Sequence, residues 1–491
     1  MYRFGFKAVL IALAMSCGPF DCVAYQDFYE LANQRIEQHR KTDIDITVLD
    51  SNGHVVSGAD VEVNMTKHAF RWGTAVVAQR INSNNTDNQI YKQKLLENFN
   101  AVVFENDLKW PPWTGAWGNS FGWHQAEPAL DWLDANNLPT RGHYLSWGTL
   151  SGSDGYGPNN NNANSIPTTL LEHIDDKLTT VGERITEWDV INHPIGCGPT
   201  TYGDIFGNAF YSTIINVSRA SALPGTEMWM NEDNILNGGS VANEYESLIN
   251  FLINDSAAPD GIGIQGHFKS SWGRNQPDTD ERIYAQLMRF SELIPRIQLT
   301  EFDIDVGVYD NNNNLISYDE QYHAELMNNY LISMFSHKDL EGVTMWGFWA
   351  GAHWLPTAAL YNQDWTPRPA LVAYQNLLFN EWWTEESGQS DVDGQYELRG
   401  FKGDYDVTVT VNGETYSSST RFDDQNGSLT VVVEAAFLLG DVNQDGVVNL
   451  LDVGPFIALI SSGDYQAEAD VNGDGVVNLL DVGPFIDVLG N

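Results

Sequence analysis

The 491-residue sequence has few cysteines and few basic residues. Two of its three cysteines, Cys17 and Cys22, lie near the amino terminus, so Cys197 has no partner for a disulfide bond once a leader is removed. Lysine and arginine number 25 against 66 acidic residues, which gives a formal net charge of −41. Such a surface repels the phosphates of nucleic acids and anionic lipids. We therefore expect no nucleic-acid partner, and a fold stabilised by packing rather than by disulfide bonds.

After the amino-terminal stretch, the sequence also lacks an apolar run long enough to span a bilayer. At the amino terminus itself, Arg3 and Lys7 precede the short apolar run AVLIALAM, and small residues follow up to Ala24. This layout predicts a signal peptide over residues 1–24 and a secreted, extracellular protein without a transmembrane segment. The residues before Cys17 loosely resemble a lipoprotein cleavage site, so lipid anchoring is the alternative.

Apolar and aromatic residues are abundant, at 42% and 12% of the chain, which is enough for a large core. Between residues 69 and 385, short apolar runs alternate with longer segments of helical spacing. Eight such strand–helix repeats predict an α/β fold, the (β/α)8 TIM barrel, with a doubly wound open sheet as the alternative. The eight runs are FRWGTAV, AVVFEND, TRGHYLSW, ITEWDVIN, EMWMNED, GIGIQGHF, IQLTEFDID and GVTMWGFW.

Most of these runs end in polar residues. Because the carboxyl ends of barrel strands all face one side, these polar groups should converge on a single cleft. The phosphate-loop and zinc-protease motifs are absent, and the G-x-G-x-x-G match at 261–266 lies inside a predicted strand. Carboxylates in a tryptophan-lined cleft suit hydrolysis of glycosidic bonds without a catalytic cofactor, with Glu301 as the best nucleophile candidate. The polar ends are Glu105–Asn106, His143, Asn192–His193, Asn231–Glu232, Gln265, His267 and Glu301, interleaved with Trp110, Trp147, Trp346 and Trp354.

Three further segments flank the predicted barrel. Residues 25–68 contain a stretch that could form a short helix, followed by alternating polar and apolar residues with a turn at Asn52–Gly53, and they predict an N-terminal β unit. Residues 386–437 alternate in the same way and predict a small β module, which would bind sugar or act as a spacer. Residues 438–491 contain a repeat, DVNQDGVVNLLDVGPF and DVNGDGVVNLLDVGPF, spaced by 29 positions.

Each copy of this repeat predicts a calcium-binding loop. Calcium requires about seven oxygen ligands, which a twelve-residue loop supplies from positions 1, 3, 5, 7, 9 and 12, with glycine at position 6 for a sharp turn. Gly446 and Gly475 occupy position 6, and position 12 carries Asp in place of the usual Glu. The expected Ca²⁺ ligands are Asp441, Asn443, Asp445, the carbonyl of Val447, Asn449 and Asp452 in the first loop, and Asp470, Asn472, Asp474, the carbonyl of Val476, Asn478 and Asp481 in the second.

The paired loops closely resemble a type I dockerin, which carries two such half-hands with Asp at position 12. This resemblance implies a C-terminal helical domain that folds with calcium and docks to a cohesin-like protein. The residues after position 9 are Leu-Leu in both copies, which differs from well-known dockerins of cellulose-degrading complexes, so the identity of the partner stays open.

The predicted barrel resembles glycoside hydrolase family 10, the retaining endo-β-1,4-xylanases, over roughly residues 69–380. The motifs that carry the resemblance are FENDLKW, RGHYLSW, GIGIQGHF, LTEFDID and MWGFW. The resemblance implies Glu301 as nucleophile, with His267 and Asp303 orienting nearby groups, and Ala350 replaces the aspartate of the closing motif. It implies a substrate-binding set of Glu105, Asn106, Lys109, Trp110, His143, Trp147, Asn192, Gln265, His267, Trp346 and Trp354.

The stretch WDVINH departs from this family, whose W-D-V-x-N-E ends in the glutamate that acts as acid and base. Asn192 matches the family's asparagine, whereas His193 stands at the position of the glutamate. Three interpretations follow. His193 itself could be the acid/base, because a nearby carboxylate such as Glu301 would stabilise a protonated imidazole. Alternatively, Glu232 could donate the proton, or the barrel could bind xylan and cleave it poorly.

The sequence therefore predicts a secreted hydrolase that cleaves internal β-1,4 bonds of xylan, or of a related β-1,4-glycan, with retention. Its catalytic residues would be Glu301 and His193. The alternative is a catalytically impaired glycan-binding protein that the dockerin-like tail delivers to a complex. A third interpretation is a barrel enzyme for a different β-glycan.

Overall fold

The structure is a computed structural model that describes residues 19–150, 155–158, 163–198, 200–269, 280–310, 312, 314–434 and 438–489. Most of the predicted signal peptide, residues 1–18, lies outside this set. The chain divides into two compact units. One contains Trp72–Tyr374 together with the preceding helix α1 (Pro19–Arg40), and the other contains Lys41–Arg71 and Gln375–Asn491.

The first unit contains a nine-stranded sheet with the order β5-β4-β3-β13-β10-β9-β8-β7-β6. The strands of this sheet pair in parallel. The end strands β5 and β6 are two parts of one predicted run, TRGHYLSW, so the sheet closes on itself as an eight-stranded barrel and the (β/α)8 prediction is confirmed. The strands are β3 (Arg71–Val76), β4 (Ala101–Phe104), β5 (Thr140–Arg141), β6 (Ser146–Trp147), β7 (Glu187–Asn192), β8 (Glu227–Glu232), β9 (Gly261–Lys269), β10 (Ile297–Asp305) and β13 (Leu340–Met345).

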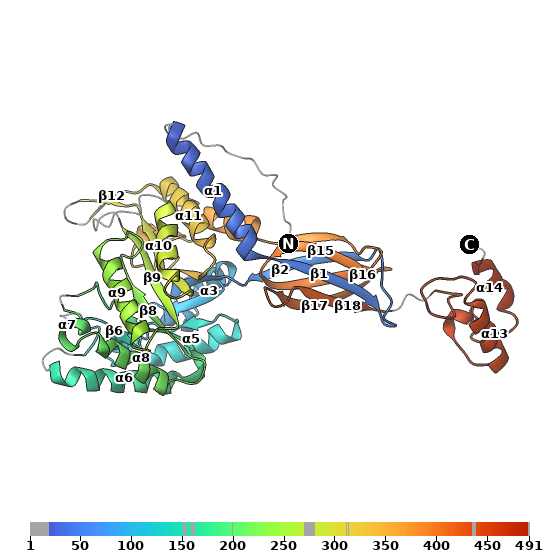
Figure 1. The fold of residues 1–491 in the computed structure, drawn as a ribbon, viewed down its shortest axis with the longest axis horizontal. Helices are drawn as coiled ribbons and strands as arrows, with labels where there is room; N and C mark the ends of the chain where they lie inside the picture. The colour runs from blue at the N-terminus through green and yellow to red at the C-terminus, as the bar shows by residue number, and fades with distance from the viewer. Residues whose placement is uncertain are drawn as a thin grey trace. The chain divides into compact units, whose positions relative to one another are not determined.

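Helices follow the strands and surround the barrel (Figure 1). Their apolar spacing explains their orientation: α10 buries Ile283, Leu287 and Phe290, which recur at the helical period. The helices of this unit, besides α1, are α2 (Ala78–Asn82), α3 (Thr86–Asn98), α4 (Trp110–Trp113), α5 (Trp123–Ala135), α6 (Ile166–Val181), α7 (Tyr202–Phe206), α8 (Ala209–Ser221), α9 (Ser240–Asn254), α10 (Asp280–Ser291), α11 (Glu320–Phe335) and α12 (Pro369–Asn376). A short hairpin, β11 (Val308–Tyr309) and β12 (Leu315–Ser317), follows β10.

The helix α1 belongs to the barrel unit rather than to the β unit that the sequence predicts over residues 25–68. The Tyr29 hydroxyl donates a 2.6 Å hydrogen bond to Asp280 at the start of α10. The Arg35 guanidinium lies 4.1 Å from the ring centre of Tyr284. These contacts link residues about 250 positions apart, and no local pattern in the sequence indicates them.

The segments around residues 41–68 and 385–433, which the sequence treats as two modules, form two sheets together. One sheet has the order β15-β1-β18 and the other β14-β2-β16-β17. Each segment alternates buried and exposed residues, for example at Ile44 and Ile46 of β1 and Val407 and Val409 of β16. A segment with one apolar face gains stability by pairing with another, here one far away in sequence. The strands are β1 (Lys41–Asp50), β2 (Asp60–His68), β14 (Glu385–Gln389), β15 (Gln395–Phe401), β16 (Gly403–Val411), β17 (Glu414–Phe422) and β18 (Ser428–Val433).

The C-terminal repeat forms a small helical domain, as predicted. Helices α13 (Val453–Ser462) and α14 (Val482–Leu489) each follow one of the two loops. Phe456 and Phe485, which occupy equivalent positions in the two copies, stack with ring centres 3.9 Å apart. The repeat thus builds its own core from matching residues, with Val442, Ala469 and Val477 completing it.

Candidate active site

The register of the barrel strands brings the predicted polar residues side by side. Trp147 on β6 lies opposite Asn192 on β7, and Asn192 lies opposite Asn231 on β8. Gln265 on β9 lies opposite Glu301 on β10. Because these strands are parallel and adjacent, their carboxyl-terminal halves present the side chains to one end of the barrel.

Glu301 is buried, with 4% of its surface exposed, and both its oxygens have donors. Asn231 donates from Nδ2 to Oε1 at 2.9 Å, and His267 Nε2 lies 3.2 Å from Oε2. His143 Nδ1 lies 4.0 Å from Oε1. Burial raises the pKa of this carboxyl group, but His143 and the hydrogen bond from His267 outweigh burial and lower its pKa to about 2. Glu301 is therefore an ionised, oriented carboxylate over the ordinary pH range.

His267 is held as a cation between two carboxylates. Its Nδ1 lies 3.1 Å from Asp303 Oδ1, and its Nε2 faces Glu301. Burial lowers the pKa of His267, but the charge of Asp303 and the hydrogen bond to Glu301 raise it to about 10. Trp354 Nε1 donates a 2.7 Å hydrogen bond to the other Asp303 oxygen. This arrangement joins His267, Asp303 and Trp354, which the family resemblance predicts near the nucleophile.

His143 approaches Glu301 from the segment between β5 and β6 and is itself oriented by a carboxylate. Its Nδ1 lies 2.8 Å from Asp189 Oδ2. Asp189 also accepts a 2.6 Å hydrogen bond from Arg141, which forms a second ion pair with Glu187. The sequence indicates His143 but not this supporting group, because a buried ion pair leaves no spacing signal along the chain.

A network of side-chain amides lies between Glu301 and the WDVINH stretch. Asn192 Oδ1 accepts hydrogen bonds from Asn231 Nδ2 at 3.0 Å and Gln265 Nε2 at 3.1 Å. Asn231 Oδ1 accepts a 2.6 Å hydrogen bond from the Thr300 hydroxyl. Asn231 therefore links Glu301 to Asn192. The sequence marked Asn231 as a polar strand end but gave it no role.

His193 is 7% exposed and has a left-handed backbone conformation with φ of 54°. Its Nδ1 lies 3.0 Å from Glu232 Oε1, and its Nε2 lies 3.1 Å from Gln265 Nε2. The ring packs 4.5 Å from the ring centre of Trp147. Because Gln265 Nε2 is a donor, the contact fits an imidazole with its proton on Nδ1 and a lone pair on Nε2.

Glu232 is fully buried and accepts hydrogen bonds at both oxygens. Besides His193, its donors are the backbone amides of Asp233 at 2.8 Å, Ile195 at 2.7 Å and Gly196 at 3.2 Å. This arrangement disfavours the interpretation in which Glu232 gives a proton to a leaving group, because its oxygens are occupied as acceptors. Glu232 instead orients His193 and the loop that follows it.

Four residues of FENDLKW lie at the edge of the site and are half-buried, namely Glu105, Asn106, Lys109 and Trp110. Burial raises the pKa of Glu105, with Lys109 opposing that shift. The Lys109 amine lies 5.9 Å from the ring centres of both Tyr156 and Trp346. Trp110 packs against His173 of α6, with ring centres 4.0 Å apart, which favours a packing role for part of this side chain.

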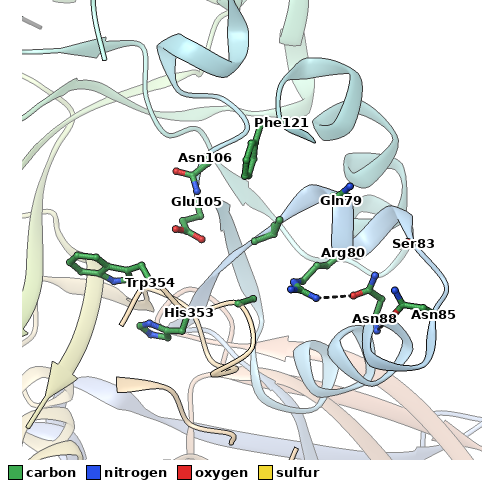
Figure 2. A pocket seen from close by; sticks show the side chains of 12 residues that line it. Gln79, Arg80, Ser83, Asn85, Asn88, Glu105, Asn106, Phe121, His353 and Trp354 are labelled. Carbon is green, nitrogen blue, oxygen red and sulfur yellow. Dashed lines mark hydrogen bonds between the residues drawn. The ribbon is translucent and has the colours of Figure 1, made fainter. Parts of the chain in front are cut away.

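Glu105 and Asn106 also line a pocket of 540 Å³ together with His353 and Trp354 (Figure 2). Trp354 lines this pocket and donates a hydrogen bond to Asp303, which pairs with His267 beside Glu301. Trp346 is buried, and its ring centre lies 5.1 Å from that of His143 and 6.1 Å from that of His267. Residues that the sequence predicts for substrate binding on different motifs are therefore in contact with one another, and Trp346 and Trp354 make these contacts.

The two C-terminal loops have oxygen-rich interiors that fit calcium. Asp452 and Asp481 are fully buried, and each accepts backbone hydrogen bonds that close its own loop, from Asn443 and Asn449 or from Asn472 and Asn478. Asp441 and Asp470 are nearly buried too. No group of three or more His, Cys, Asp or Glu side chains suited to a metal occurs in the described parts of the chain. The expected ligand set instead mixes carboxylates with amide and main-chain oxygens.

Comparison with known proteins gives two matches along the chain. A family described as Glycosyl hydrolase family 10 matches residues 62–377, and the Dockerin type I domain matches residues 439–483. Native xylanase 10B from Thermotoga maritima has the same fold, with a TM-score of 0.54 at 20% identity over 64% of this chain and 96% of that chain. A family 10 endoxylanase from a sugarcane soil metagenome is similar, with a TM-score of 0.54 at 20% identity over 63% of this chain and 96% of that chain.

Two curated relatives cover more of the sequence. Anti-sigma-I factor RsgI6 of Acetivibrio thermocellus is 29% identical over 409 residues, which is 81% of this chain and 49% of that protein. Endo-1,4-beta-xylanase 2 of Arabidopsis thaliana is 25% identical over 389 residues, 77% of this chain and 33% of that protein. The chain thus spans half or less of the length of these relatives. Within the described residues, no helix has the length and apolar character needed to cross a membrane.

Proposed function

We propose that this chain, which belongs to glycosyl hydrolase family 10, cleaves internal β-1,4 bonds of xylan with retention of configuration. Glu301 is the nucleophile and His193 transfers the proton. The observation that carries the proposal is the ionised Glu301 carboxylate, joined through Asn231 to Asn192 at the strand that ends in His193. Retaining glycosidases need such a carboxylate on one side of the scissile bond and a proton-transfer group on the other.

The reaction has two steps. A Glu301 oxygen attacks the anomeric carbon while the bond to the leaving sugar breaks, and the leaving oxygen takes a proton from His193 Nε2. Water then attacks the same carbon and gives a proton back to His193, which releases the sugar and restores the Glu301 carboxylate. Asn231 and His267 hold Glu301 in the attacking orientation by hydrogen bonds at its two oxygens.

Glu232 supports this exchange at the other ring nitrogen. When His193 carries two protons, its Nδ1–H points at the buried Glu232 carboxylate 3.0 Å away, which stabilises the positive charge. The arrangement resembles the role of a carboxylate behind a catalytic histidine in hydrolases that use a histidine base. Glu232 is a positioning residue here, because it acts through His193. The backbone amides of Ile195 and Gly196 hold its carboxylate in place.

A second candidate function is glycan binding with weak hydrolysis, and one contact favours it. The Gln265 amide donates toward His193 Nε2 at 3.1 Å, so this nitrogen acts as an acceptor and carries no proton in that arrangement. Proton donation then requires Gln265 to move or rotate its amide group. Without general acid assistance, xylan hydrolysis would fall by about 10²–10⁴-fold.

The experiment that separates these functions compares xylan with an aryl β-xyloside whose leaving group needs no proton. Hydrolysis of both substrates supports His193 as a working donor. Hydrolysis of the aryl xyloside alone supports an intact nucleophile without a donor, and His193→Glu should then raise activity on xylan. If neither substrate is hydrolysed while binding to xylan is retained, the proposed hydrolase activity is contradicted. The variant Glu301→Gln is the control for contaminating activity.

For the C-terminal domain, we propose calcium binding in both loops and docking to a cohesin-like partner of a secreted complex. The type I dockerin match and the buried Asp452 and Asp481 support this part. Calcium would compensate the buried carboxylates. Addition of Ca²⁺ to chelated protein should raise the melting temperature of this domain, and Asp452→Asn with Asp481→Asn should remove the rise. An identical melting profile with and without Ca²⁺ would contradict calcium binding by this domain.

A further inference from the structure

The pocket beside Glu105 has a second, positively charged end. Glu105 and Trp354 lie toward one end and Arg80, with Asn88, toward the other (Figure 2). Its 540 Å³ volume lies within the range of about 300–1,000 Å³ that is typical of ligand sites. The family resemblance places sugar-binding groups only at the Glu105 end. Nothing in the proposed reaction uses Arg80.

Arg80 is held in a fixed orientation by neutral groups. Its two terminal nitrogens donate hydrogen bonds to Asn88 Oδ1 at 3.2 Å and to the Gly351 carbonyl at 3.1 Å. The guanidinium also lies 4.7 Å from the ring centre of Trp349, which stacks on Trp365. These contacts use two of the five N–H donors of the guanidinium, so donors remain for a ligand.

The charge of Arg80 is uncompensated by a direct partner. Among the described residues, none of the ion pairs includes Arg80. This is notable in a chain with 66 acidic and 25 basic residues. Glu105, the carboxylate of the same pocket, interacts with Lys109 on its own side. The pocket therefore has one end suited to neutral hydroxyl groups and another suited to an anion.

We propose that Arg80 binds the carboxylate of an acidic sugar, a uronic acid carried as a substituent on the xylan chain. This inference rests on the proposed function, since the polysaccharide must first occupy the cleft at Glu105. A planar guanidinium with fixed orientation matches the two oxygens of a carboxylate. The charge of the protein as a whole repels polyanions, but screening limits that repulsion to about 10 Å at ordinary salt, so a local cation can still select an acidic group.

The test measures binding of two polymers that differ only in this charge: glucuronoxylan, and the same glucuronoxylan after chemical reduction of its carboxyl groups to alcohols. Glu301→Gln protein is used so that neither polymer is cut. We expect about tenfold tighter binding of the acidic polymer, the size expected for one charge-assisted hydrogen-bonding group. Arg80→Gln should equalise the two affinities, whereas Arg80→Lys should keep part of the preference.

Two controls make the outcome specific. Arg184→Gln removes the same charge at a surface position paired with Asp131 and Asp134, and it should leave the preference unchanged. Unsubstituted xylohexaose should bind the parent and the Arg80→Gln variant equally, which also shows that the variant is folded. Equal binding of both polymers by the parent, or a preference that survives Arg80→Gln, would overturn the proposal. Failure to bind xylohexaose would instead count against the proposed function.

Discussion

The two sides of the candidate active site are built differently. On the Glu301 side, the residues match the family motifs, and the carboxylate is fixed by Asn231 and His267. On the opposite side, His193 replaces the expected glutamate and has a carboxylate, Glu232, behind it. The side of the proposed nucleophile thus keeps the residues of the family motifs, whereas the side of the proposed proton donor has a different group with its own supporting carboxylate.

The effect of a substitution at a catalytic position depends on the residues that surround it. A histidine in an apolar pocket would favour loss of function. His193 instead lies between the buried Glu232 and the Gln265 amide, and its ring packs at a tilt against Trp147. The Glu232 contact suits proton transfer and the Gln265 contact opposes it, so under the proposed function the balance between these two contacts sets the rate of xylan hydrolysis.

The largest expected effect lies on the nucleophile side. Glu301→Gln should lower kcat/KM for both xylan and an aryl β-xyloside by at least about 10⁴-fold, because no covalent intermediate can form. Glu341→Gln is the control, since Glu341 pairs with Arg296 at the start of β13, away from the cleft. Rates above one hundredth of the parent rate in the Glu301 variant would mean that another group is the nucleophile.

On the proton-transfer side, His193→Ala should separate the two substrates. We expect a fall of about 10²–10⁴-fold in kcat/KM for xylan, whose leaving group needs a proton. The aryl xyloside should lose less than about tenfold in kcat/KM, because its leaving group departs as an anion. Added azide should attack the glycosyl enzyme and yield a xylosyl azide, since an anion needs no base. Equal activity of the variant and the parent on xylan would remove His193 from the mechanism, and His54→Ala provides the surface control.

The sequence predicted the barrel and the polar strand ends that lie side by side at one end of it, because both depend on local patterns. Strand–helix alternation sets the order of the strands, and register then places Gln265 beside Glu301 and Asn192 beside Asn231. The role of Glu232 was not predictable, since it depends on a 3.0 Å contact between side chains 39 positions apart. The joining of β1 and β2 to strands beyond residue 384 was missed for the same reason: pairing over such separations has no local signal.

Glu232→Gln should have a smaller effect than removal of His193. The variant keeps the shape of the side chain but removes the charge that stabilises a protonated His193, and its amide would face backbone donors. We expect a fall of about ten- to a hundredfold in kcat on xylan with KM unchanged, as for a misplaced proton-transfer group. The aryl xyloside should be affected little. An equal loss on both substrates would indicate general damage to the site rather than a defect in proton transfer.

The smallest expected effect is the response of the nucleophile side to acid. An ordinary glutamic acid loses its charge near pH 4.3, but the pKa of Glu301 is lowered to about 2 by His143 and His267 against the effect of burial. Because a lowered pKa keeps the carboxylate ionised as pH falls, kcat/KM for the aryl xyloside should change less than about twofold between pH 7 and pH 4. His267→Gln removes the charged partner of Glu301 and should move the acid limb to higher pH. A midpoint near pH 4.3 in the parent, while circular dichroism shows it folded, would mean that these histidines do not hold Glu301 ionised.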